Sequence, residues 1–255
     1  MTLLKEYNLL SGYIVASHAT GLDAAEKKIL RDSGIYVSST PDTEAQMGMG
    51  FPVALDPDIV YGSLGADCHT NNSASILSRA RTLLLLARQQ RNAELLDQGK
   101  YPATLRASTQ RVFNLATIDG ARAVGMGDVI GSIREGKLAD LVVFDAGPAN
   151  SPGMLCASEF DPVTAVVRHS DVRDIEVVIV DGKVRKREGR LVGVDGKHGN
   201  TNKTKRTMEW SEIAREVVKS QREVQNRIDA LDVKKGEELL VKMLHIDLSK
   251  FERSD

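Results

Sequence analysis

The stretch Val60-Tyr61-Gly62-Ser63-Leu64-Gly65-Ala66-Asp67-Cys68-His69 decides the fold that we expect for this chain. Its apolar part is typical of a buried β-strand over residues 59–66, and Asp67 follows directly. Polar residues 70–73 then lead into a strong helical pattern over residues 75–89. In barrels of parallel strands the chemistry lies at the carboxyl ends of the strands, so Asp67 is the first candidate for a functional residue.

Two earlier apolar runs, residues 13–18 and 35–39, also read as strands, and the sequence between them predicts a helix over residues 24–32. Asp23 is expected to cap this helix, with Glu26 three residues later completing a capping box. Strand, helix and strand with short connections are typical of a parallel sheet. His18 ends its strand as Asp67 ends another.

The segments after each strand are less regular. Residues 42–54 form a loop rich in Gly and Met that either lines a pocket or is a plain connector, with room for one helical turn before Gly48. A polar connector is expected over residues 91–101. A second helix is expected over residues 103–118, continuing to Gly125.

The pattern changes from Val129 onward to short strands and tight turns, which predicts a small antiparallel sheet. Asp181-Gly182 is its strongest turn signal. We therefore expect three parts: an α/β part over residues 1–125, a β-sandwich portion over 126–195, and a linker with a C-terminal amphipathic helix over 196–255. The expected elements of the last two parts are strands 141–144, 163–168, 175–180, 183–187 and 190–194, a basic linker 196–207 and a helix 209–228.

Composition excludes several classes of function. Aromatic residues make up 4% of the 255 residues and the net charge is −1, so we expect no nucleic-acid partner. No apolar run has the length of a membrane span, and we expect no membrane partner. Cys68 and Cys156 lie far apart without metal-ligand spacing, which indicates a reducing, cytoplasmic location.

The strand ends together resemble a known family. Ile14-Val15-Ala16-Ser17-His18 is similar to the sixth strand of the amidohydrolase superfamily barrel, residues 35–41 to its seventh, and Leu64-Gly65-Ala66-Asp67 to its eighth, where Asp is the hallmark. Residues 116–145 resemble the segment that links this barrel to its outer β-sandwich. The likeness runs from about residue 13 to residue 194, and the branch it resembles most holds cytosine deaminases and chlorohydrolase-type enzymes.

This resemblance implies an α/β fold: a partial TIM-type barrel holding the last three strands, followed by a small antiparallel β-sandwich portion and a C-terminal helix. It implies metal-dependent hydrolysis of a non-peptide C–N bond, amide or amidine, including deamination of a heterocycle, in a small-molecule substrate. The implied cofactor is a divalent metal, zinc or iron. Asp67 would be both metal ligand and general base, and His18 would polarise the substrate or steady the hydroxide.

Two alternatives concern single residues. Asp67 could instead be a strand-end carboxylate that caps the following turn. His69 could contact the substrate or cap the helix that follows Ser73. The other histidines, His169, His198 and His245, read as surface residues.

The sequence also departs from the family pattern, because it has neither the His-x-His pair nor the fifth-strand histidine of the metal site. We therefore expect metal binding to be weak or absent, since affinity depends on the number of ligands. The chain reads as a truncated family member that is inactive alone. A catalytically dead homologue serving as a binding or assembly module and an incomplete gene model are the alternatives, and a homo-oligomer is possible in each case.

Overall fold

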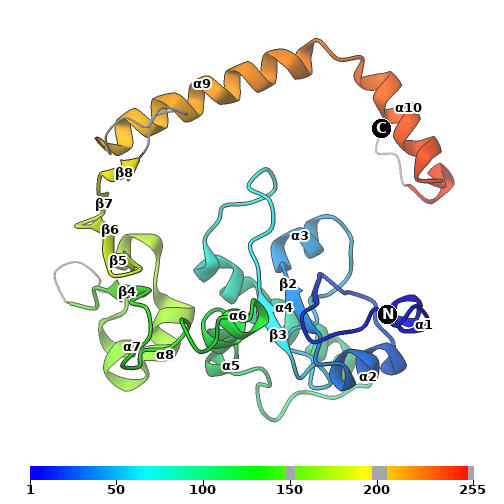
Figure 1. Ribbon diagram of the computed structural model, residues 1–255. Coiled ribbons are helices and arrows are strands. Elements are labelled where there is room, and N and C mark those ends of the chain that lie inside the picture. Colours follow the sequence, from blue (N-terminus) through cyan, green and yellow to red (C-terminus); the bar gives the residue numbers. More distant parts are fainter. Residues whose placement is uncertain (148–152, 197–205, 252–255) are drawn as a thin grey trace. The chain divides into compact units, whose positions relative to one another are not determined.

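The computed structural model of the protein describes residues 1–147, 153–196 and 206–251 (Figure 1). These residues form two compact units, 1–191 and 192–255, and each unit is considered by itself. The predicted boundary between residues 125 and 126 falls inside the first unit, so the separate β-sandwich portion stays a prediction. Within the described ranges no helix is both long and apolar enough to cross a membrane.

The first unit contains the predicted parallel sheet, with strands β1 (Val15–Ser17), β2 (Tyr36–Ser39) and β3 (Gly62–Leu64). They lie side by side in chain order, all parallel. The strands are shorter than predicted, although backbone hydrogen bonds from Val37 N to Tyr61 O and from Gly65 N to Ser39 O extend the β2–β3 pairing. This arrangement confirms the α/β class and the order of the three strands.

A short helix α1 (Thr2–Glu6) precedes the sheet, and helix α2 (Ala24–Asp32) connects β1 to β2. Asp23 caps α2 as predicted, because its carboxylate accepts the backbone N–H of Glu26 at 2.8 Å. Leu30 of α2 is buried together with Ile35, Val37 and Ile59 in one of two core clusters. Burial of this apolar face holds the α2 crossover on the β1–β2 pair.

Four helices follow β2 and β3: α3 (Pro41–Gln46), α4 (Ile76–Leu96), α5 (Thr109–Leu115) and α6 (Ile118–Ala123). The helix α4 continues to Leu96, seven residues beyond its predicted end at Gln89, because no glycine or proline interrupts it before Gly99. The predicted helix over 103–118 was wrong at its start, since Ser108 caps α5 by accepting the N–H of Arg111 at 3.1 Å. Leu64, Leu83, Leu84, Val112 and Leu115 form the second core cluster, which joins β3 to these helices.

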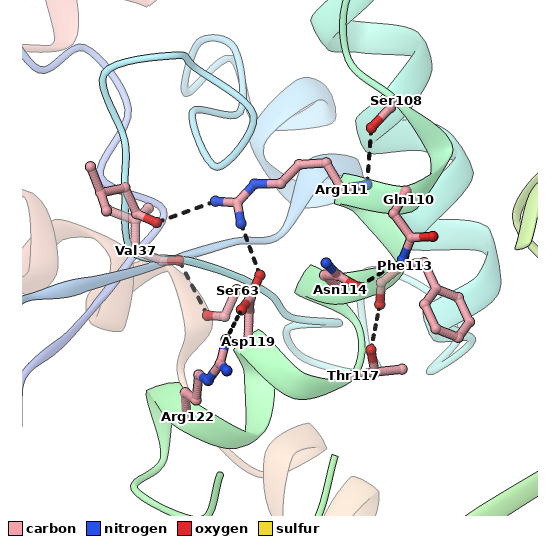
Figure 2. A network of polar contacts seen from close by, with 11 residues as sticks. Val37, Ser63, Ser108, Gln110, Arg111, Phe113, Asn114, Thr117, Asp119 and Arg122 are labelled. Atoms are coloured by element: carbon pink, nitrogen blue, oxygen red, sulfur yellow. Dashed lines mark hydrogen bonds and ion pairs between the residues drawn. The ribbon is translucent and has the colours of Figure 1, made fainter. Parts of the chain in front are cut away.

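A polar network fixes α5 and α6 against the beginning of β3 (Figure 2). Arg111 and Arg122 bind the two carboxylate oxygens of Asp119 at 2.9 and 3.1 Å, and Asp119 is 8% exposed. Arg111 also donates to the carbonyl of Val60 at 3.3 Å. Because Val60 lies just before β3, this network sets the position of the strand whose other end carries Asp67.

The second sheet of this unit is antiparallel, in the order β4-β5-β6-β7. Its strands are β4 (Leu141–Phe144), β5 (Ile175–Val180), β6 (Lys183–Arg187) and β7 (Arg190–Leu191). The turn between β5 and β6 is confirmed at Asp181 and Gly182, with φ of 50° and 72°. A two-residue hairpin turn of type I′ needs positive φ at both positions, which explains why Asp-Gly was a reliable signal.

The predicted strand over residues 163–168 was wrong, because this segment is helical. The elements here are α7 (Leu155–Phe160), α8 (Pro162–Thr164), the π-helical η1 (Ala165–His169) and the 3₁₀ helix η2 (Val172–Asp174). Asp161 accepts the N–H of Thr164 at 3.0 Å, and Pro162 occupies the first helical position. These residues favour the start of a helix, because proline is favoured at the first helical position. The apolar residues that follow are therefore helical and do not form a strand.

The described residues of the second unit form a two-stranded antiparallel ladder of β8 (Val194–Gly196) and β9 (Arg206–Met208), and three helices. The helices are α9 (Trp210–Asp229), α10 (Val233–Met243) and the 3₁₀ helix η3 (Leu248–Lys250). The amphipathic helix predicted over 209–228 is confirmed, while α10 was not predicted. Most of the predicted linker, and His198 with it, lies outside the described residues.

Candidate active site

The candidate site lies at the carboxyl edge of the parallel sheet, where three chain segments leave the strands. His18 directly follows β1, Thr40 directly follows β2, and Asp67 lies three residues beyond β3. Parallel strands end at the same edge, so these residues share one end of the sheet. The charge of His18 contributes to the pKa of Asp67, which agrees with their placement at one edge.

The His18 ring is held through its Nδ1 atom. Nδ1 lies 2.8 Å from Oγ1 of Thr40 and 3.5 Å from Oε1 of Glu44. The backbone at His18 has φ of 63°, and its N–H donates to the carbonyl of Ser38 at 2.9 Å. Since a left-handed backbone is costly for a residue with a side chain, the hydrogen bond to β2 helps to hold His18 in this conformation.

Glu44 is a functional candidate that sequence reasoning missed. Its side chain is fully buried, and Oε1 accepts the N–H of Thr40 at 2.8 Å, while Oε2 is buried without a hydrogen-bond partner among the described residues. Burial raises the pKa of the Glu44 carboxyl, although the Thr40 N–H and His18 act in the opposite direction. Thr40-Pro41 followed by a glutamate in the first helical turn was the available signal, since such sequences begin helices.

Asp67 is exposed at the same edge, in contrast to Glu44. Its Oδ1 accepts the N–H of Cys68 at 2.7 Å. The hydroxyl of Thr43 is the main cause that lowers the pKa of Asp67, followed by this backbone N–H and by the charge of His18. The carboxylate is therefore ionised at neutral pH.

His69 is exposed, two residues beyond Asp67. It does not cap the following helix, because Ser75 does so by accepting the N–H of Ser78 at 3.3 Å. That alternative for His69 was wrong, and a role in substrate contact stays a prediction. His169 lies at the end of η1 and His245 after α10.

The loop that carries Asp67 and His69 is fastened to α3. Asn72 donates to Thr43 at 3.2 Å and accepts from Gln46 at 3.1 Å. Arg79 of α4, 4% exposed, forms an ion pair with Asp42 of α3. These contacts make α3 a common support for Glu44, which reaches His18, and Thr43, which reaches Asp67.

A polar pocket lies at the opposite edge of the sheet, away from His18 and Asp67. It is lined by Tyr36, at the beginning of β2, and by charged residues that include Arg122, Arg134 and Lys137. Lys137 uses its ammonium group to bind the carbonyls of Gly127 and Ile130. The pocket thus belongs to the loops after α6 rather than to the candidate site.

The residues at the site do not fit a resident metal ion. Across residues 1–147, 153–196 and 206–251, no three His, Cys, Asp or Glu side chains are grouped so that they could hold one. The chemistry available here is proton transfer between an imidazole, a buried carboxylate and an exposed, ionised carboxylate.

Comparison with known proteins decides the family. A model of the Amidohydrolase family matches residues 3–185, which is well over half of the chain. The chain belongs to the amidohydrolase family. This agrees with the resemblance seen at the ends of the three strands, including Asp67 and His18.

Two of the similar relatives are deaminases, and both are much longer than this chain. The chain is 28% identical over 182 residues to a 5-methylthioadenosine/S-adenosylhomocysteine deaminase from Acetivibrio thermocellus, covering 71% of this chain and 39% of the relative. It is 32% identical over 199 residues to a 5'-deoxyadenosine deaminase from Methanothermobacter thermautotrophicus, covering 76% and 42%. The chain therefore spans about two-fifths of the length of these amidohydrolases.

A solved structure gives the same result for the fold. An adenosine deaminase from Xanthomonas campestris, crystallised with bound zinc, matches with a TM-score of 0.66 and 26% identity. The match covers 90% of this chain and 46% of that enzyme. The α/β fold of this chain is therefore similar to part of an amidohydrolase deaminase.

Proposed function

We propose that this chain corresponds to the C-terminal portion of a metal-dependent amidohydrolase and forms part of its TIM-type barrel. The reaction of the whole enzyme would be hydrolysis of a non-peptide C–N bond. The observation that carries the proposal is the convergence of His18, Thr40 with Glu44, and Asp67 at one edge of three parallel strands. Deaminases act on amidine groups of heterocycles, and the names of the relatives favour a purine nucleoside as the substrate class.

In this proposal each site residue predicted from the sequence has a role. Asp67 is the metal ligand and proton acceptor, His18 polarises the substrate or steadies the hydroxide, and His69 contacts the substrate from the loop. The metal would be zinc or iron. Since Asp67 and His18 are too few to hold it, we infer that further ligands are required and that the chain is inactive alone. The proposal includes a cytoplasmic location, from the cysteine usage.

A second candidate function is a catalytically dead homologue that acts as a binding or assembly module. The specific observation in its favour is the state of Asp67, whose pKa is lowered by Thr43 and Cys68. A carboxylate with a lowered pKa is a weaker proton acceptor.

Zinc titration of the purified full chain separates the two candidates. Equilibrium dialysis compares the wild type with Asp67→Asn and with His18→Gln, and circular dichroism verifies that each variant is folded. A hydrolase portion should bind zinc weakly, Asp67→Asn should reduce that binding, and His18→Gln should retain it because His18 is not the assigned ligand. Zinc binding that is the same in Asp67→Asn and in the wild type would overturn the metal role of Asp67 and favour the binding module.

A further inference from the structure

The proposed function assigns no role to Glu44, although burial of its carboxylate costs free energy of folding. A fully buried carboxylate loses its hydration, and one of its oxygens finds no replacement partner in the described part of the chain. Its other oxygen meets Thr40 N–H at 2.8 Å and lies 3.5 Å from Nδ1 of His18. Because a helix start needs only a neutral acceptor, capping α3 does not explain a charged group at this position.

The neighbours of Nδ1 indicate which nitrogen of the His18 ring carries the proton. Nδ1 lies 2.8 Å from the hydroxyl oxygen of Thr40 and 3.5 Å from Oε1 of Glu44. An ionised carboxylate can only accept a hydrogen bond, whereas a hydroxyl can donate or accept. A proton on Nδ1 therefore suits both neighbours, with the Thr40 oxygen as its acceptor.

We propose that Glu44 is a positioning residue that, together with the Thr40 hydroxyl, keeps neutral His18 in the tautomer with its proton on Nδ1. The described contacts of the ring all involve Nδ1. In this tautomer Nε2, on the other side of the ring, carries the free lone pair. A second group that orients a histidine in this way is a common feature of sites that use the ring as a base.

The consequence for chemistry rests on the proposed function. His18 would present a proton acceptor to the substrate, and Glu44 would stabilise the imidazolium formed when Nε2 takes up a proton. The step balances within the site: one proton moves from a substrate or water O–H or N–H to Nε2, and His18 becomes a cation beside the Glu44 anion. An N–H bond forms at Nε2 as the O–H or N–H bond of the donor breaks, and Glu44 keeps all its covalent bonds.

Nitrogen NMR of the full chain labelled in histidine tests this directly, because the shifts of Nδ1 and Nε2 identify the protonated nitrogen. The spectrum is recorded on the alkaline plateau of a pH titration, where the His18 ring is neutral. We expect wild-type His18 to be mainly in the Nδ1–H form. Glu44→Gln keeps an acceptor for the Thr40 N–H but adds an N–H donor, so the Nδ1–H form should lose its majority.

A matched pair at Thr40 separates positioning from a purely structural role. Thr40→Ser keeps the hydroxyl, so its His18 should retain the wild-type tautomer. Thr40→Val has a similar shape without the hydroxyl, so its His18 should lose the preference for the Nδ1–H tautomer. The proposal is overturned if wild-type His18 is mainly Nε2–H, or if Glu44→Gln and Thr40→Val leave the tautomer unchanged. The measurement uses no substrate or metal, so failure of the proposed hydrolysis would not change its outcome.

Discussion

Oε1 of the fully buried Glu44 lies 3.5 Å from Nδ1 of His18, at the edge of the sheet where three parallel strands end. The two residues come from different elements, α3 and the segment after β1. Their pairing gives a half-buried histidine a defined orientation, because the polar contacts of the ring with the described residues both involve Nδ1.

The buried carboxyl of Glu44 predicts an unusual pH dependence of stability. Burial raises its pKa above the ordinary 4.5, so between the two values the folded chain holds a proton that the unfolded chain has released. The free energy of unfolding should therefore fall as pH rises through this window. Glu44→Gln should remove this fall and be more stable than the wild type at neutral pH, because burying a neutral amide costs less hydration than burying a carboxylate. Urea unfolding at several pH values measures the free energy of unfolding of the wild type and of Glu44→Gln. If this free energy depended on pH equally in the two proteins, the prediction would be contradicted.

The low pKa of Asp67 should depend mainly on Thr43. We expect Thr43→Val to raise the pKa of the Asp67 carboxyl, because the hydroxyl of Thr43 is the largest cause of its lowering. Thr43→Ser is the control that keeps the hydroxyl. Carbon NMR titration of the Asp67 carboxyl provides the measurement. If the pKa of Asp67 in Thr43→Val equalled that in the wild type, the Cys68 N–H and His18 would be sufficient to lower it.

The ion pair between Arg79 and Asp42 should be sensitive to loss of one partner. Asp42→Asn leaves the 4%-exposed guanidinium of Arg79 without its carboxylate and should cost about 3 kcal/mol of unfolding free energy. Arg79→Met should cost less, since the freed Asp42 is 21% exposed and can be hydrated. The double variant should be more stable than the sum of the single effects predicts. Strict additivity in chemical denaturation would argue against a coupled pair.

The open sheet predicts self-association. β1 and β3 are the outer strands of the three-stranded sheet, and on or beside β1 the side chains of Tyr13 and Val15 are 96% and 38% exposed. Unpaired strand edges favour pairing with another chain, and a lysine on an edge opposes it. Sedimentation velocity should show association that increases with protein concentration and weakens in Val15→Lys. A monodisperse monomer at all concentrations would contradict this expectation.

Local signals in the sequence predicted the parts of the fold that depend on local chemistry. Asp23 before α2 and Asp181-Gly182 between β5 and β6 act through nearby backbone groups, so the residues themselves specify the structure. The run over residues 163–168 was misread because its apolar residues suit a strand or a buried helix equally, and Asp161 decided between them.

The residues of the candidate site also differ in how far the sequence could predict them. His18 and Asp67 could be found because each follows a strand, and parallel strands bring such residues to one edge. Glu44 could not be found from the sequence, because its importance comes from complete burial beside Nδ1 of His18. This burial is decided by how α3 packs on the sheet. A glutamate at the start of a helix is otherwise an ordinary surface residue.

The central claim is that the edge carrying His18 and Asp67 is a hydrolytic site that needs further ligands. Ammonia release from 5'-deoxyadenosine by the full chain, with and without added zinc, tests it most directly. The account predicts no zinc-dependent release above background, because two side chains cannot hold the ion that activates water. Release that a chelator abolishes and that Asp67→Asn eliminates would contradict it, since the chain would then supply a complete site by itself.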